Sequence, residues 1–167
     1  MTTITGRTWV FGDGIDTDII IPARYLVLPL EEMKEKAMEP VRPEWSAQVE
    51  PGDIVIGGRN FGCGSSREQA PAVLEALGVR AIVAESFARI FFRNAINLGL
   101  PLVECPGITA HVREGEVITV DVSIGIVIVG DGTTRLDGTR LPEFLLEIIG
   151  DGGLIPHLLK TQVSSQR

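Results

Sequence analysis

Apolar residues in the first two thirds of the chain form short continuous runs that alternate with helically spaced runs. Continuous apolar runs between turn residues are typical of buried strands, whereas spacings of three and four residues are typical of helices. The pattern predicts strands at 8–11, 54–56, 81–84 and 102–103, main helices at 66–77 and 87–98, and shorter helices at 31–38 and 43–48. Alternation of strands and helices favours parallel pairing with right-handed crossovers.

After Pro106 the pattern changes to β-rich segments separated by glycine-rich turns. Segments 117–122, 124–129 and 133–136 are predicted to form an antiparallel meander, followed by helices at 141–149 and 154–159. The expected fold class is α/β with mixed parallel and antiparallel strands, in a single domain over residues 1–167. We expect the core at 8–160 and a frayed tail at 161–167.

The composition narrows the possible partners. A formal net charge of −7 argues against nucleic acid, so an anionic substrate would have to be bound by local arginines. No apolar run is long enough to span a bilayer, and the N-terminal residues lack the apolar segment of a secretion signal. These features predict a cytoplasmic protein with no membrane partner.

Two cysteines, Cys63 and Cys105, are too few for a disulfide framework, and without a CxxC pair they do not form a zinc or iron–sulfur site. We therefore predict no cofactor and no metal on this chain. His111 and His157 are isolated in the sequence, and no site is assigned to either.

The most informative segment is a glycine-rich loop at 57–68, which follows the apolar run 54–56. Its four glycines let the backbone approach a ligand closely, because no Cβ blocks the way. Ser65, Ser66 and Arg67 follow, just before the predicted helix, where free N–H groups favour a small anion. Arg67 could grip a carboxylate through two parallel hydrogen bonds.

A simpler interpretation of this loop stays open. Ser65 or Ser66 could cap the following helix, and Arg67 could be a solvated residue of its first turn. An arginine near a helix N-terminus opposes the dipole preference, however, and a nearby anion would offset that cost. The nucleotide pattern GxxxxGK[ST] is absent. Cys63 has no paired base beside it, so we expect it to serve packing.

A second polar cluster contains Asp16 and Asp18, with Arg24 and Tyr25 just downstream. Two carboxylates this close can serve metal binding or acid–base chemistry. An Asx-turn with a helix cap is the commoner explanation for two aspartates at this spacing. The sequence alone leaves both open.

Three strings occur in order along the chain: DTDIIIPARYL at 16–26, GRNFGCGSSRE at 58–68 and SFARIFFRN at 86–94. Together they resemble the small subunit of 3-isopropylmalate dehydratase, in the aconitase superfamily, over about residues 8–159. The resemblance implies a swivelling β/β/α domain like the C-terminal domain of aconitase. It also implies a separate large subunit that carries a [4Fe–4S] cluster, in a heterodimer or heterotetramer. Self-association of the isolated chain is also open.

The implied reaction interconverts 2-isopropylmalate and 3-isopropylmalate, in leucine biosynthesis, by removing water and adding it back. By this resemblance Ser65 acts as an alkoxide base, and Ser66 and Arg67 bind a substrate carboxylate. A serine alkoxide needs oriented N–H donors and a cation, which we expect from the turn 62–66 and from Arg67.

The resemblance gives two further roles. Asp18 would orient a histidine of the large subunit that handles the leaving water, and Arg24 would contact substrate. A loop facing the variable group of the substrate would contain Tyr25, Leu26, Val27 and Leu28.

The apolar character of this loop predicts substrate choice. Homoaconitase-like proteins tend to carry an arginine at the position of Val27, because their substrate has an additional carboxylate. An apolar loop would leave that carboxylate unpaired but would welcome an isopropyl or methyl group. Isopropylmalate is therefore preferred over homoaconitate, whereas 2,3-dimethylmalate and citramalate-type substrates stay open.

Two non-catalytic alternatives also stay open: an anion-binding module, and a structural scaffold whose glycine loop is only a turn. We further expect that segment 25–40 becomes ordered only with a partner or substrate, because its apolar pattern is weak.

Overall fold

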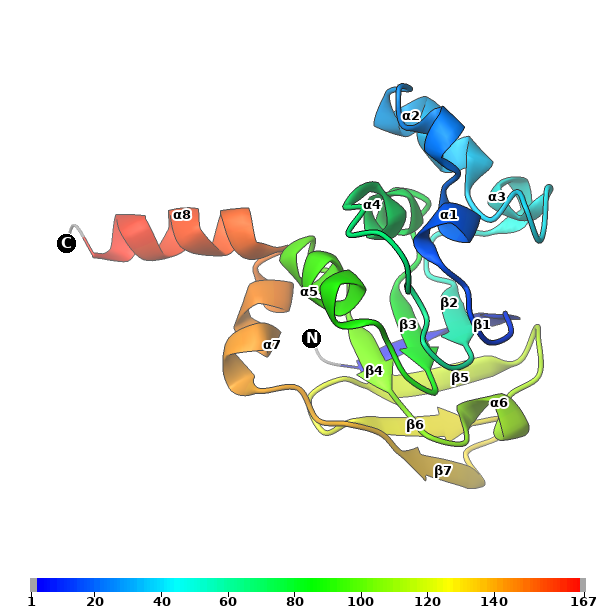
Figure 1. The fold of residues 1–167 in the computed structure, drawn as a ribbon. Helices are drawn as coiled ribbons and strands as arrows, with labels where there is room; N and C mark the ends of the chain where they lie inside the picture. Colours follow the sequence, from blue (N-terminus) through cyan, green and yellow to red (C-terminus); the bar gives the residue numbers. More distant parts are fainter. Residues whose placement is uncertain (1–2, 166–167) are drawn as a thin grey trace.

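The computed structural model describes residues 3–165 (Figure 1). Its strands form one seven-stranded sheet in the order β4-β3-β2-β1-β5-β6-β7. The strands are β1 (Thr3–Val10), β2 (Ile54–Gly57), β3 (Ala81–Ala84), β4 (Leu102–Glu104), β5 (Val117–Asp121), β6 (Ile126–Val129) and β7 (Thr134–Asp137). Strands β1 to β4 pair in parallel, and β1, β5, β6 and β7 pair antiparallel. The predicted mixed α/β fold is confirmed.

Strand β1 joins the parallel and antiparallel halves of the sheet. Its residues 3–7 pair with β5, and its residues 8–10 pair with β2. Gly6 lies before this change of partner, where a Cβ would overlap the carbonyl oxygen of Gly52. The predicted strand at 8–11 was therefore too short, because the N-terminal half of β1 alternates in burial and has no continuous apolar run.

The helices and helical turns surround this sheet on several sides. They are α1 (Thr17–Ile20), η1 (Ala23–Tyr25), α2 (Leu30–Met33), η2 (Lys34–Lys36), α3 (Trp45–Gln48), α4 (Gln69–Ala76), α5 (Arg89–Asn97), α6 (Ile108–His111), α7 (Glu143–Gly150) and α8 (Leu154–Ser164). Helices α4 and α5 lie beside the parallel strands, and α2 lies at the far end of the molecule (Figure 1).

Helix α4 begins later than predicted. Its cap position is Glu68, and no side chain caps it. Ser65 and Ser66 therefore do not cap this helix, and Arg67 precedes its first turn. The chemistry-bearing residues lie in the loop itself.

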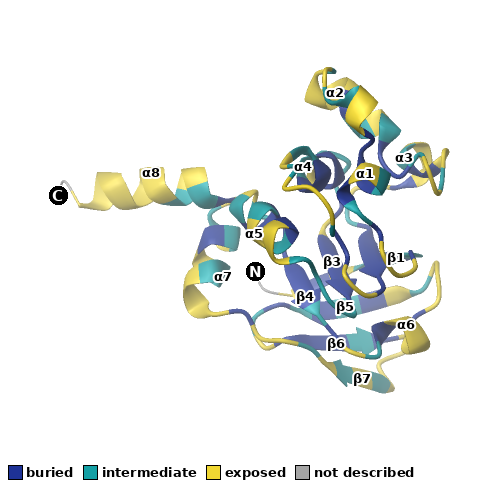
Figure 2. Ribbon diagram, viewed as in Figure 1, coloured by how far each residue is buried: buried dark blue, intermediate teal, exposed yellow. Residues whose placement is uncertain are grey.

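The core is centred on the parallel strands. Every residue of β2 and β3 is buried, as the continuous apolar runs predict (Figure 2). Segment 25–40 also contributes to the core, since Met33, Ala37 and Met38 are buried. The buried side chains of this segment pack on the chain itself, and its ordering by a partner or substrate stays a prediction.

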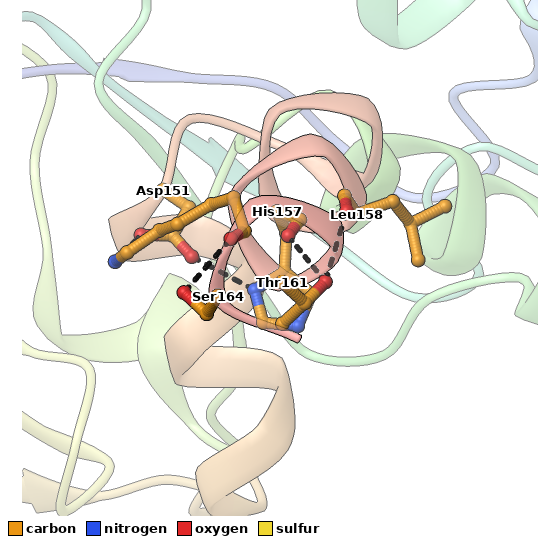
Figure 3. A network of polar contacts seen from close by, with 6 residues as sticks. Asp151, His157, Leu158, Thr161 and Ser164 are labelled. Atoms are coloured by element: carbon orange, nitrogen blue, oxygen red, sulfur yellow. Dashed lines mark hydrogen bonds and ion pairs between the residues drawn. The ribbon is translucent and has the colours of Figure 1, made fainter. Parts of the chain in front are cut away.

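Helix α8 projects from the body of the molecule, and most of its surface is exposed (Figures 1 and 2). It runs to Ser164, so residues 161–164 are helical, and residues 166–167 lie outside the described residues. Fraying of the tail at 161–167 stays a prediction. Asp151 anchors its start: one carboxylate oxygen is 2.8 Å from His157 Nδ1, and the other is 2.6 Å from Lys160 Nζ (Figure 3). Over residues 3–165, no helix is long and apolar enough to cross a membrane.

The carboxylate of Asp53, in the turn before β2, links this turn to side chains of β1. Its Oδ2 accepts hydrogen bonds from Arg7 Nη2 at 2.9 Å, from Trp9 Nε1 at 2.8 Å and from the Glu50 N–H at 2.9 Å. Burial alone would raise the pKa of this carboxyl, but the hydrogen bonds from Arg7, Glu50 and Trp9 together hold the pKa below its usual value.

Replacement of Asp53 by alanine is expected to lower the free energy of unfolding by about 3 kcal/mol at neutral pH, because three donors lose a buried charged acceptor. A carboxyl with a lowered folded-state pKa stabilises above its unfolded pKa of about 3.9, and this contribution is lost as the pH falls through the folded value. Urea unfolding across pH 7 to about 3 measures both effects. The account would be contradicted if the loss of unfolding free energy in Asp53→Ala did not shrink on acidification. It would also be contradicted if Asp137→Ala, at an exposed side chain, caused the same loss.

Candidate active site

The glycine-rich loop at 57–68 packs on segment 86–94, which contains the third string of the sequence pattern. The Phe61 N–H donates to the Ser86 carbonyl at 3.0 Å, and the Ala88 N–H donates to the Phe61 carbonyl at 3.0 Å. Phe61 is fully buried beneath the loop. Segment 86–94 thus supports the loop through backbone hydrogen bonds.

Two further contacts fix the loop on helix α5. Gly62 has a φ of +80°, and a Cβ there would overlap the ring of Phe91. Asn94 Nδ2 donates to the Ser66 carbonyl at 3.5 Å. A glycine is required at 62 because of its positive φ and because a Cβ would overlap Phe91 of α5.

Ser65 is exposed at the tip of this loop, and its Oγ is 3.2 Å from Thr17 Oγ1. Thr17 is 2% exposed, and its backbone N–H donates to the Cys63 carbonyl at 2.8 Å. Thr17 therefore positions the Ser65 hydroxyl through two contacts. The sequence analysis missed this residue, although it lies between the two aspartates that it singled out.

Only part of the turn 62–66 can supply N–H donors. The Gly62 N–H donates to the Ile15 carbonyl at 2.7 Å, and the Cys63 N–H donates to the Asn60 carbonyl at 3.2 Å. Within residues 3–165, the backbone N–H groups of 64–66 have no acceptor. The expected set of donors around the serine is thus narrowed to those three groups.

Arg67 lies against the upstream cluster. Its Nη1 donates to the Ile21 carbonyl at 2.8 Å and is 3.2 Å from Asp18 Oδ1, and its side chain is only 14% exposed. The anion expected to offset an arginine beside a helix start is therefore supplied within the chain. Nε and Nη2 of Arg67 make no hydrogen bond to any described residue, so one edge of the guanidinium can still take a carboxylate.

The two aspartates of the upstream cluster have different roles. Asp16 caps α1 by accepting the Ile19 N–H at 2.7 Å, as the simpler interpretation predicts. Asp18 accepts the Ala23 N–H at 3.1 Å, and this bond, followed by the one from Arg67, lowers the pKa of the Asp18 carboxyl. Asp18 is thus an ionised carboxylate whose side chain is 66% exposed.

Arg24 and Tyr25 form a separate polar cluster around Glu39. Arg24 Nη2 lies 2.7 Å from Glu39 Oε1, and the Tyr25 hydroxyl donates to the same oxygen at 2.6 Å. The charge of Arg24 also contributes to lowering the Asp18 pKa, so the two clusters are electrostatic neighbours. The structure therefore gives the Arg24 guanidinium a partner within the chain.

The apolar loop residues face in two directions. Leu26 and Leu28 are half-buried and pack against the core of the chain. Val27 is 88% exposed and stands at the tip of the loop. Of the three, Val27 is the side chain that is open to solvent.

The residues of this chain do not fit an iron–sulfur cluster. No group of three or more His, Cys, Asp or Glu side chains in the described part of the chain could hold a metal ion. Cys105 is buried, and burial raises the pKa of its thiol to about 11, which opposes the thiolate that a cluster needs. Cys63 is partly exposed and lies within the serine loop, two residues before Ser65.

Comparison with known proteins decides the family. The model of the aconitase C-terminal domain matches residues 31–106. The isopropylmalate/citramalate isomerase small subunit of Methanocaldococcus jannaschii is 50% identical over 164 residues, covering 98% of each chain. This chain belongs to the 3-isopropylmalate dehydratase small-subunit family.

Two further similarities support this membership. The solved structure of 3-isopropylmalate dehydratase from Methanocaldococcus jannaschii superposes with a TM-score of 0.91 at 34% identity, over 98% of both chains. The methanogen homoaconitase small subunit of Methanothermobacter thermautotrophicus is 48% identical over 159 residues, 95% of this chain and 92% of that protein. Relatives of nearly equal identity thus carry names that differ in substrate, so overall identity does not choose between them.

Proposed function

We propose that this chain is the small subunit of a hydro-lyase that interconverts 2-isopropylmalate and 3-isopropylmalate by dehydration and rehydration. The observation that carries the proposal is the convergence of Ser65, Thr17, Asp18 and Arg67, from two segments 48 residues apart, at one place where Ser65 and Asp18 are exposed. Family membership supports the reaction class. The step belongs to leucine biosynthesis by the same resemblance.

Ser65 is the proposed base. Its Oγ takes the proton from the carbon next to a substrate carboxylate, and the electron pair of that C–H bond forms the double bond as hydroxide leaves the neighbouring carbon. Thr17 Oγ1 and the free N–H groups of 64–66 stabilise the serine oxygen while it carries negative charge. Arg67 and Ser66 hold the carboxylate beside it, which fixes the C–H bond within reach.

The other half of the site is proposed to come from a large subunit that carries the [4Fe–4S] cluster, since this chain has no ligand set for one. When bound there, the cluster supplies Lewis-acid chemistry to the substrate hydroxyl. Asp18 has an exposed carboxylate held in place by Ala23 and Arg67, and this suits it to orient a histidine of the partner. The proposed complex is a heterodimer or heterotetramer in the cytoplasm.

The loop of Tyr25, Leu26, Val27 and Leu28 is proposed to select the substrate. Val27 presents a small apolar surface to the variable group, which suits isopropyl or methyl. An additional carboxylate would find the Arg24 guanidinium of this loop already paired with Glu39, and it would lose its hydration without gaining a free cation.

A substrate panel on the complex reconstituted from both subunits tests this proposal. The kcat/KM for isopropylmalate is expected to exceed that for homoaconitate by about a hundredfold, because a charge is desolvated without a partner. Citramalate and 2,3-dimethylmalate belong in the same panel, since the loop does not discriminate against their methyl groups. Better turnover of homoaconitate than of isopropylmalate would show that the loop argument is wrong.

The same experiment separates the non-catalytic alternatives. An anion-binding module would bind dicarboxylates without the partner and would add nothing to its turnover. Activity that appears only when both subunits are mixed rejects that alternative. A scaffold role would instead predict that Ser65→Ala with Arg67→Ala leaves assembly and turnover intact.

A further inference from the structure

Glu39 binds the polar side chains of Arg24 and Tyr25. They lie at the start of the segment between residues 20 and 38 that contains Val27, which we call the substrate loop. A single oxygen, Oε1, lies 2.7 Å from Arg24 Nη2 and 2.6 Å from the Tyr25 hydroxyl, and the Glu39 side chain is 26% exposed. The Arg24 guanidinium also stacks on the Tyr25 ring, with its Cζ 4.6 Å from the centroid. These three side chains form one compact unit in which the charge of Arg24 is neutralised.

The backbone keeps Glu39 in this position. The preceding residue, Met38, is fully buried with a φ of +61°, a conformation that a non-glycine residue adopts only when its surroundings impose it. Its N–H donates to the Ile20 carbonyl at 2.9 Å, which closes the neck of the loop between 20 and 38. The backbone of Glu39 is thus held in place next to the contact between residues 20 and 38, and its carboxylate contacts Arg24 and Tyr25.

The two lysines of the same loop, Lys34 and Lys36, already have neighbours. Lys34 forms an ion pair with Glu31 at 2.6 Å, and Lys36 Nζ lies 5.7 Å from the centroid of the Tyr25 ring. Val27 at the tip is apolar and 88% exposed. Arg24 is therefore the guanidinium of this loop that could bind an extra substrate carboxylate. Glu39 pairs with its Nη2 and neutralises its charge, while Nε and Nη1 have no hydrogen-bond partner among the described residues.

We infer that Glu39 is a specificity-determining residue, which excludes substrates with a third carboxylate by neutralising Arg24. This inference rests on the proposed function, because it concerns the choice among substrates of the same reaction. It explains how the chain can keep an arginine beside the substrate loop and still favour an apolar variable group. Hydrogen bonds from Tyr25 and Arg24 lower the pKa of Glu39, so its carboxylate stays charged at neutral pH.

The test replaces Glu39 by glutamine, which has the same shape and can still accept the Tyr25 hydroxyl but has no charge. In the reconstituted complex, the ratio of kcat/KM for homoaconitate to that for isopropylmalate is expected to rise about tenfold, chiefly through a lower KM for homoaconitate, because Arg24 gains a free charge-assisted contact. Adding Arg24→Met to Glu39→Gln should abolish the rise. Glu32→Gln, at an exposed glutamate of the same loop, is the matched control.

Glu39→Asp separates charge from geometry, since it shortens the side chain but keeps the carboxylate. A charge effect predicts little change of the ratio in Glu39→Asp, whereas a merely structural role predicts that both variants lose turnover of both substrates alike. An unchanged ratio in Glu39→Gln, or a rise that persists without Arg24, would overturn the inference. If Glu39→Gln does not assemble, Glu39→Met removes the charge at similar length and the same rise is expected. Failure of the wild-type complex to turn over isopropylmalate would instead refute the proposed function.

Discussion

Replacement of Arg67 by lysine is expected to lower kcat/KM of the reconstituted complex about a hundredfold or more, because a planar fork is exchanged for a point charge. In the structure, Nη1 of Arg67 is used by the Ile21 carbonyl and by Asp18 Oδ1, and Nε and Nη2 are left for a carboxylate. A lysine has one nitrogen, which cannot hold Asp18, the carbonyl and the substrate in their relative positions. The loss should appear in both kcat and KM.

Steady-state kinetics with isopropylmalate measure this effect, with assembly checked by co-purification of the two subunits. Arg80→Lys, at an exposed arginine that lies after α4 and outside the serine loop, is the matched control. A change of less than threefold in Arg67→Lys, in an intact complex, would show that Arg67 holds the loop but does not bind the substrate.

Replacement of Ser65 by alanine is expected to reduce kcat about a thousandfold or more, with a smaller change in substrate affinity. The Ser65 Oγ is exposed and 3.2 Å from Thr17 Oγ1, so its removal deletes the proposed base and leaves the buried support intact. Since Ser65 and Ser66 make no helix-capping hydrogen bond, the substitution should cost little stability. Loss of turnover can then be assigned to chemistry.

Ser66→Ala is the matched control, because it removes a hydroxyl one residue away in the same exposed turn. Its effect is expected to be smaller and to fall mainly on KM, as for a substrate contact. Equal losses in the two variants would argue that the loop is simply disturbed, and near-wild-type turnover by Ser65→Ala would exclude Ser65 as the base.

The buried framework was predictable from the sequence because its signal is local. Continuous apolar runs located β2 and β3 within one residue, and helical spacing located α5 within two. Strand β1 was found only in part, since residues 3–7 obtain their order from pairing with β5, more than a hundred residues later. A pairing of that kind leaves little trace in a local window of residues.

The sequence predicted the polar residues of the site but not the contacts that hold them in place. The sequence singled out Ser65, Arg67 and Asp18, and the structure brings them together. Thr17 and Glu39 were missed, because each acts through a contact that the folded chain creates. The neck of the substrate loop depends on a positive φ at Met38, for which a buried methionine gives no sequence signal.

The distinction between a base and a mere structural serine can be measured on the elimination half-reaction. Ultraviolet absorbance follows formation of the unsaturated dicarboxylate by the complex that carries Ser65→Ala, and isopropylmalate binding is measured on the same sample. We predict that this complex binds the substrate but forms the unsaturated acid at roughly a thousandth of the wild-type rate or less. Elimination at a near-wild-type rate by an assembled Ser65→Ala complex would contradict the central claim that this chain supplies the base.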